Sequence, residues 1–474
     1  MGNLLTNIVG SLNTLLWSYV LIFLLIVLGI YFSFRTNFVQ FKFIREMIRL
    51  LTDGAKQEKG EGISSFQAFC ISTASRVGTG NLAGVAIAIA TGGPGAVFWM
   101  WLIALIGGAS SFVESTLAQI YKVKDKDGYR GGPAYYMEKA LNKRWMGIIF
   151  SILITLCFGL VFNSVQSNTI ALSFQESFDT SRSMMGIILS VVTGIIIFGG
   201  VKRIARVAEV IVPVMAVAYV IIATFVIVKN MAAIPQIFSL IIGSALGFKQ
   251  AAGGAIGVAL MQGIKRGLFS NEAGMGSAPN AAATAEVSHP VKQGLIQTLG
   301  VFTDTILICS ATAFIILLSG VYTNGDLTGI QLTQIALSSQ VGSWGGTFVA
   351  ICILLFAFSS IIGNYYYGET NIEFINGNAI WLTIYRVCVV GMVYFGSVAK
   401  IQIVWDLADL FMGLMALINL IAIGLLGHIA FAALKDYAKQ KKEGKDPVFK
   451  SSNIEGVTNA ECWENNIEGI KKAN

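Results

Sequence analysis

Two apolar segments of this chain are each interrupted near their middle by polar and glycine-rich sequence. The interruptions are Ser75-Arg76-Val77-Gly78-Thr79-Gly80-Asn81 and Ser270-Asn271-Glu272-Ala273-Gly274-Met275-Gly276-Ser277. A helix inside a bilayer can be interrupted only where its freed backbone groups find other partners. Two interruptions in corresponding places of two halves therefore predict a solute site near the bilayer midplane.

The first interruption offers two kinds of backbone group. The amides of Gly78, Thr79 and Gly80 would begin an outer half-helix, whose positive dipole end suits an anion such as a carboxylate. The carbonyls of Ala74 and Val77 would end the inner half-helix and suit a hard cation such as Na⁺. The alternative is a glycine-rich stretch that only allows close helix packing, which is common in membranes.

The second interruption would supply backbone carbonyls for an amino group and small walls around a small side chain. Lys265, Arg266 and Glu272 flank it. Charged groups at membrane depth are costly, so these should pair with one another or reach a water-filled vestibule. The sequence leaves two roles open for these three residues, a gating or structural ion pair and direct contact with the ligand.

Other polar side chains lie within apolar runs. Ser359 and Ser360 are adjacent hydroxyls with Asn364 one turn further on, and Gln166 gives another run a polar spot. Such hydroxyls either ligate ions or bond back to their own helix. Polar packing between helices competes for the others. Four acidic residues in or beside apolar runs could relay protons, cap helices or pair with arginine, and they stay unassigned: Glu114, Asp304, Asp406 and Asp409.

The composition is that of a membrane protein, with 55% hydrophobic and 12% charged residues in 474. A soluble globular domain is excluded. Eleven segments are predicted to span the bilayer as helices. They are 15–34, 63–91, 95–121, 146–175, 181–200, 203–228, 253–284, 293–320, 345–370, 379–396 and 404–432.

Loop charge predicts the orientation of these helices. Basic residues crowd 35–59 and 122–145, the segment 321–344 has no Lys or Arg, and the tail is rich in Lys. The positive-inside rule then places the N-terminus outside and the C-terminus in the cytoplasm. The net charge of +7 accordingly indicates anchoring at the cytoplasmic side and no nucleic-acid partner.

The spans divide into an N-terminal helix and two groups of five. We expect residues 1–62 to form that helix and a cytoplasmic connector, with repeats at 63–228 and 253–432 joined by an extracellular connector at 229–252. An odd number of helices per repeat inverts the second group. The cytoplasmic tail, 433–474, is predicted to be solvated and partly disordered, with contact to anionic lipid as the alternative.

Further motifs carry a family resemblance. Gly92-Gly93-Pro94-Gly95-Ala96-Val97-Phe98-Trp99-Met100-Trp101, followed by Leu102 to Gly107, resembles the signature of the alanine or glycine:cation symporter family. Gly78-Thr79-Gly80-Asn81, the run from Asn271 to Pro279 and Tyr365-Tyr366-Tyr367-Gly368-Glu369 join it, so the resemblance covers residues 15–432. It implies a leucine-transporter-like fold of five plus five inverted helices with one extra N-terminal helix.

The resemblance also implies Na⁺-driven uptake of alanine or glycine across a prokaryotic plasma membrane, and roles for individual residues. Gly78, Thr79 and Gly80 would bind the substrate carboxylate, and the pocket would be completed by Gln166 and by the backbone from Asn271 to Gly276, which includes Gly274 and Met275. The principal Na⁺ site would consist of Ala74, Val77, Ser359 and Ser360, with Asn81 in a second site. Asn364 replaces a Trp of several relatives, which would enlarge the pocket or alter selectivity.

We therefore predict a symporter that couples Na⁺ entry to uptake of alanine or glycine, with no organic cofactor and no required oligomer. A proton-coupled transporter of the same fold is the first alternative. A channel would need a continuous polar pore face on several helices, where this sequence has localised breaks. An enzyme would need a reactive constellation, and the two histidines, His289 and His428, are far apart and belong to no metal motif.

Overall fold

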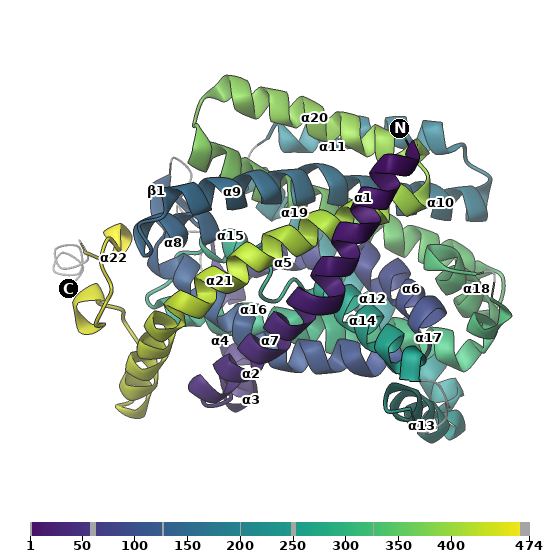
Figure 1. Ribbon diagram of the computed structural model, residues 1–474, viewed down its shortest axis with the longest axis horizontal. Helices are drawn as coiled ribbons and strands as arrows, with labels where there is room; N and C mark the ends of the chain where they lie inside the picture. The colour runs from purple at the N-terminus through teal and green to yellow at the C-terminus, as the bar shows by residue number, and fades with distance from the viewer. Residues whose placement is uncertain are drawn as a thin grey trace.

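The computed structural model describes residues 2–56, 63–125, 128–199, 201–247, 253–325 and 327–464. Within these residues the fold is helical (Figure 1) except for a hairpin of β1 (Val123–Asp125) and β2 (Gly128–Arg130). In the described part of the chain, eight helices are long and apolar enough to cross a membrane, against the eleven spans predicted. They are Asn7–Arg35, Gly95–Ile120, Arg144–Phe178, Arg203–Lys229, Pro290–Ser319, Trp344–Ile375, Ala379–Val398 and Gln402–Lys442.

Both predicted interruptions are confirmed as breaks. In the first, helix α5 (Ser65–Arg76) ends at an extended Val77, and the chain resumes as the π-helical η2 (Gly80–Gly84) and α6 (Val85–Gly92). In the second, α14 (Gly253–Asn271) is separated from α15 (Ala278–Ala282) by left-handed residues at Glu272, Gly274 and Gly276. Glycine adopts such positive φ angles without the steric cost that other residues meet.

The remaining elements complete the chain. Those of the N-terminal half are α1 (Gly2–Leu15), η1 (Leu16–Val20), α2 (Leu21–Arg35), α3 (Val39–Lys42), α4 (Ile44–Lys56), α7 (Gly95–Ile120), α8 (Pro133–Lys139), α9 (Arg144–Ile154), η3 (Thr155–Phe162), α10 (Asn163–Phe178), α11 (Arg182–Ile197), α12 (Val201–Lys229), η4 (Met231–Ala233) and α13 (Ile234–Ala245). Those of the C-terminal half are α16 (Pro290–Val301), η5 (Phe302–Cys309), α17 (Ser310–Ser319), η6 (Val321–Asn324), α18 (Gly329–Val341), α19 (Trp344–Ile375), α20 (Ala379–Val398), α21 (Ile401–Lys442), η7 (Ser451–Asn453) and α22 (Glu461–Glu464).

The helices pack around the two breaks, whose residues are buried. Helix α7 packs on α14 and α16, α10 packs on α19 and α20, and α11 packs on α20. The long helix α21 runs across the face shown in Figure 1, where the N-terminal helix α1 packs against it. The expected connector at 229–252 contains α13, which packs on α7, and the expected loop at 321–344 contains α18.

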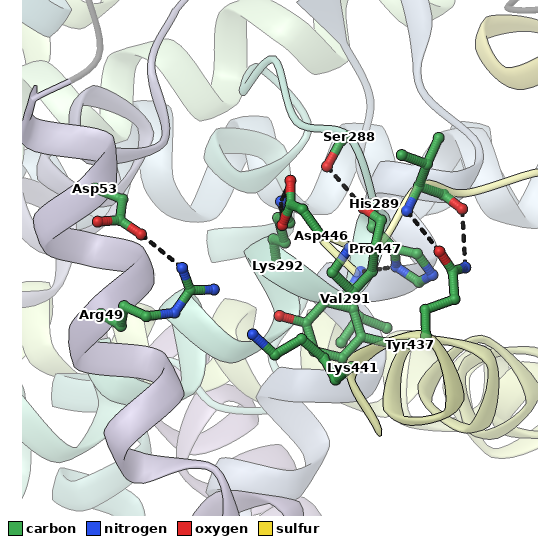
Figure 2. A network of polar contacts seen from close by, with 12 residues as sticks. Arg49, Asp53, Ser288, His289, Val291, Lys292, Tyr437, Lys441, Asp446 and Pro447 are labelled. Atoms are coloured by element: carbon green, nitrogen blue, oxygen red, sulfur yellow. Dashed lines mark hydrogen bonds and ion pairs between the residues drawn. The ribbon is translucent and has the colours of Figure 1, made fainter. Parts of the chain in front are cut away.

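The predicted solvated tail is mostly exposed over residues 443–464, but it also carries buried apolar anchors that the sequence did not predict. Helix α21 continues to Lys442, and the chain beyond it folds back against the helix ends (Figure 2). Four large or aliphatic apolar side chains of this segment are buried, and their burial supplies a driving force for the packing. They are Phe449, Ile454, Ala460 and Trp463. Residues 465–474 lie outside the described part of the chain.

Candidate substrate and cation site

The amides of the first break already face side-chain oxygens. The N–H of Gly78 donates to Oδ1 of Asn81 at 2.9 Å. Both the N–H and the hydroxyl of Thr79 donate to Oε1 of Gln166, at 3.0 and 2.6 Å. Gln166 comes from α10, so two of the predicted residues meet across a helix interface. The arrangement shows that these amides can hold a carbonyl-type oxygen in a buried site.

The carbonyl side of the same break meets α19. The hydroxyl oxygen of Ser360 lies 2.8 Å from the carbonyl oxygen of Ala74 and 3.4 Å from that of Val77. Three oxygens thus converge, the ligand type that hard cations prefer. The hydroxyl of Ser359 has other partners, a main-chain oxygen of its own helix at 2.8 Å and Sδ of Met215 at 3.9 Å.

A buried carboxylate links Asn81 to the second break. The Nδ2 of Asn81 donates to Oδ1 of Asp304 at 2.6 Å, and the hydroxyl of Thr305 donates to Oδ2 at 2.8 Å. The Nδ2 of Asn271 donates to the same hydroxyl at 3.2 Å. All four side chains are fully buried. The sequence left Asp304 unassigned. In the structure it lies between Asn81, the predicted ligand of the second cation site, and the second break.

Glu272 connects the two breaks. The hydroxyl oxygen of Ser75 lies 2.7 Å from both Oε1 of Glu272 and Oδ1 of Asn364. The hydroxyl of Ser277 donates to Oε2 of Glu272 at 2.6 Å. Among the residues that the structure describes, the buried Nδ2 of Asn364 has no hydrogen-bond partner. Asn364 therefore lies beside the first break, and its side-chain amide N–H groups are available to a ligand.

The glycine amides of the second break face a carboxylate of α7. The N–H groups of Gly274 and Gly276 donate to the two carboxylate oxygens of Glu114 in α7, at 3.1 and 3.0 Å. Asn419 of α21 donates to the same carboxylate at 2.8 Å. Met275, between the glycines, is fully buried. Sequence reasoning missed Glu114 and Asn419 as site residues, because an isolated polar residue in a span carries no sign of its partner.

The two breaks touch beneath an aromatic layer. A Cβ added at Gly80 would lie 3.1 Å from Cα of Ser270, so these backbones meet closely. Next to this contact, the ring centroid of Phe269 lies 4.6 Å from that of Phe162 and 4.8 Å from that of Trp405. Three aromatic rings, from η3, α14 and α21, therefore lie next to the contact between the breaks.

The basic residues flanking the second break form an ion cluster. The Nζ of Lys265 and Nη2 of Arg266 lie 3.0 and 2.6 Å from Oδ2 of Asp409 in α21, and all three residues are buried. The guanidinium of Arg266 also lies 4.7 Å from the ring centroid of Trp405. The structure thus gives these cations a carboxylate partner instead of a place in the breaks.

Comparison with known proteins identifies the family. Residues 2–451 match the model of the sodium:alanine symporter family. The chain is 63% identical over 463 residues to a probable sodium/glutamine symporter of Bacillus subtilis (strain 168), covering 98% of this chain and 97% of that protein. It is 46% identical over 476 residues to a putative sodium/proton-dependent alanine carrier protein of the same strain, covering 97% and 98%.

Among solved structures, the chain is similar to a mutant of the manganese transporter of Eremococcus coleocola. The identity is 15% and the TM-score 0.49, over 80% of this chain and 81% of that one. The family match, in contrast, covers nearly the whole chain. This multi-pass membrane protein therefore belongs to the sodium:alanine symporter family, whose members are carriers and not enzymes.

Proposed function

We propose that this protein is a Na⁺-coupled symporter that carries a small neutral amino acid, alanine or glycine, into the cell. The observation that carries the proposal is the first break, where donor amides and acceptor carbonyls lie side by side in a buried site. Thr79 presents an N–H on one side. Ala74, Val77 and Ser360 present oxygens on the other.

Each group has a defined role in this proposal. The substrate carboxylate binds the amides of Gly78 to Gly80 and displaces Oε1 of Gln166, an oxygen of similar chemistry. Backbone carbonyls near Asn271 bind the ammonium group. Na⁺ binds at Ala74, Val77, Ser359 and Ser360, and a second cation site forms at Asn81.

The proposed architecture is the five-plus-five inverted repeat with an extra N-terminal helix, eleven helices in all. Two features support it. Each proposed repeat opens with a broken helix, α5 to α6 and α14 to α15. Helices at corresponding positions of the two repeats pack in pairs, α7 on α16, α10 on α19 and α11 on α20. We further propose that the N-terminus lies outside the plasma membrane of a prokaryote and the C-terminus in the cytoplasm.

Transport in this scheme alternates access to the breaks from either side. The aromatic layer of Phe162, Phe269 and Trp405 and the ion cluster at Asp409 close the outer path. Each positive charge that enters gains roughly 2.3 kcal/mol per 100 mV of inside-negative potential. One Na⁺ could therefore sustain a gradient of about fifty-fold of a zwitterion from that voltage, at about 1.4 kcal/mol per factor of ten.

Purified protein in proteoliposomes tests the proposal directly. Uptake of labelled alanine, glycine and glutamine is measured with an inward Na⁺ gradient and with choline replacing Na⁺. We expect Na⁺ to accelerate uptake of at least one of them, with a saturable dependence on both solutes. Equal rates in Na⁺ and choline for all three amino acids would contradict the proposal.

Glutamine is a second candidate substrate. A relative 63% identical to this chain is named as a probable sodium/glutamine symporter. The Nδ2 of Asn364, which has no hydrogen-bond partner among the described residues, could donate to the side-chain amide oxygen of glutamine. If it does, Asn364→Ala lowers glutamine uptake by about tenfold, the value of one hydrogen bond to a buried polar group. Alanine uptake by the same variant serves as the control and should change little.

Proton coupling is the alternative to Na⁺ coupling. One observation supports it, the buried carboxylate of Asp304 beside Asn81. A relative is named a putative sodium/proton-dependent alanine carrier. In that case uptake follows an imposed pH gradient without Na⁺, and Asp304→Asn abolishes this component. If Na⁺ alone drives uptake, a pH gradient imposed without Na⁺ does not change the rate of uptake.

A further inference from the structure

We propose that residues 443–464 form a strap that holds the cytoplasmic side of the transporter closed and must loosen for that side to open. The strap begins at the end of α21, and Figure 2 shows its residues Asp446 and Pro447 beside Lys292 and Ser288. The inference goes beyond the proposed function, because it concerns control of access and not the identity of the solute.

One end of the strap is bonded to the turn before α16. The N–H of Phe449 donates to the carbonyl of Ser288 at 2.9 Å, and the Ser288 hydroxyl donates to the carbonyl of Pro447 at 2.8 Å. The side chain of Phe449 is buried, with its ring centroid 5.3 Å from that of His289 and 5.1 Å from that of Trp463. This end is thus fixed by backbone pairing and by an aromatic anchor.

The other end is bonded to elements of the N-terminal half. The indole N–H of Trp463 donates to the carbonyl of Gln119 in α7 at 3.0 Å. The Nδ2 of Asn459 donates to the carbonyl of Lys139 in α8 at 3.1 Å. The ammonium of Lys122 lies 5.1 Å from the Trp463 ring centroid. The strap therefore ties α7 and α8 to α16 and α21, which belong to different halves of the chain.

The strap also borders the approach to the inner half of the first broken helix. A cleft of about 490 Å³ is lined by α4, by Ser65 at the start of α5, by residues 286–288 and by Asp446 of the strap. Asp446 pairs with Lys292 across this cleft at 2.7 Å. The N–H of Glu286 donates to the carbonyl of Ile63, two residues before α5, at 3.0 Å.

These contacts form a mechanical series. The strap holds Ser288, the segment containing Ser288 holds Ile63, and Ile63 leads into α5, whose far end carries the proposed cation carbonyls. Access from the cytoplasm requires α5 to move away from α16 and widen the cleft. Such movement would break contacts of the strap. Because these contacts exist only in the closed state, they stabilise it and lower the population of the state that is open to the cytoplasm.

The accessibility of Ser65 in the cleft provides the test. Ser65→Cys is placed in full-length protein in which Cys388 and Cys462, the two cysteines that are not buried, are replaced by serine. Inside-out vesicles are treated with a membrane-impermeant maleimide. Phe449→Ala removes the aromatic anchor, and Val448→Ala changes an exposed neighbour. We expect about tenfold faster labelling with Phe449→Ala, equivalent to about 1.4 kcal/mol, and no change with Val448→Ala.

A charge series gives an independent measurement at the ion pair between the exposed Asp446 and the partly buried Lys292. Asp446→Lys opposes Lys292 and should accelerate labelling about twofold, because exposed ion pairs contribute little. Lys292→Asp combined with Asp446→Lys should restore the parental rate. Equal labelling of Phe449→Ala and Val448→Ala in well-folded protein overturns the strap. If Phe449→Ala does not fold, equal labelling across the charge series overturns it.

The labelling requires no transport, so its outcome is separate from the uptake experiment. A protein that labels as expected but takes up no amino acid would contradict the proposed function and leave the strap intact. A protein that transports with Na⁺ but shows constant labelling would do the reverse.

Discussion

Ser359 and Ser360 share one chemistry but have different surroundings. Both hydroxyls lie within hydrogen-bond distance of the Phe356 carbonyl of α19, but only Ser360 also meets the carbonyls of the first break, while Ser359 approaches α12. We expect Ser360→Ala to weaken the apparent Na⁺ affinity about tenfold, because a bond to a charged group contributes about 1.5–3 kcal/mol. Ser359→Ala should weaken it less. The Na⁺ dependence of uptake at fixed amino acid concentration measures the apparent Na⁺ affinity of both variants. Equal effects of the two substitutions would contradict a distinct role of Ser360 in binding Na⁺.

Glu114 supports the second break by accepting from two glycine amides and from Asn419. In Glu114→Gln the new NH₂ group faces one of those donors, which loses its acceptor. The unmet buried donor costs about 1–3 kcal/mol. Thermal unfolding in detergent should therefore occur at a lower temperature than in the parent. The matched control is Glu138→Gln, in a partly exposed pair with Arg144 whose loss should matter little.

The contrast between these residues shows what a sequence can reveal about a site. Gly78, Thr79 and Gly80 were predictable because glycine and hydroxyl residues in an apolar run are costly unless the backbone is used. Glu114 and Asn419 lie far apart along the chain and meet only after α7, the second break and α21 have packed. No spacing between two such positions carries that information.

At the scale of elements, Gly276 illustrates why the second break has its shape. Its φ is 85°, and an added Cβ would lie 2.8 Å from Cγ of Asn419. Gly320 also has a positive φ, 71°, with nothing within 4 Å of an added Cβ. We expect Gly276→Ala to reduce thermal stability and uptake severely. Gly320→Ala should cost only the left-handed backbone penalty of about 1–2 kcal/mol. Similar losses in both would show that packing at the break is loose.

The breaks, the long spans and their order could be predicted because hydrophobic runs and midplane glycines are local signals. The helices α13 and α18 escaped prediction. Ile234–Ala245 is apolar but too short to span, and Gly329–Val341 is polar enough to read as a loop. The packed strap escaped for another reason. Phe449, Ile454 and Trp463 are single anchors in a mostly polar segment, with no helical or strand period.

For the molecule as a whole, the strap predicts a dependence on pH through His289. Burial lowers the pKa of His289 below 6.5, although its contact with Asp436 acts in the opposite direction. The neighbours that face it are Tyr437, Lys292 and Asp446. Because burial lowers the pKa of His289, the imidazole binds a proton more tightly when the strap has been released than when it is packed. The strap is therefore firm above about pH 6.5 and loosens as the pH falls below it.

Hydrogen exchange of residues 446–454, corrected for intrinsic rates, measures this loosening between about pH 7.5 and pH 5.5. We expect protection to fall on acidification in the parent protein. The fall should be smaller in His289→Gln, which keeps a polar side chain but cannot titrate. Equal pH dependence in the two proteins would exclude His289 as the cause.

The position of the strap along the chain also orders the steps of biogenesis. A ribosome makes the chain from its N-terminus, so Phe449 and Trp463 emerge only after every candidate span has been synthesised. Their receptors at Ser288, Gln119 and Lys139 are then already in place. Fastening therefore follows synthesis of the candidate spans, and a newly inserted carrier passes through an interval in which the strap does not yet restrain its inner mouth.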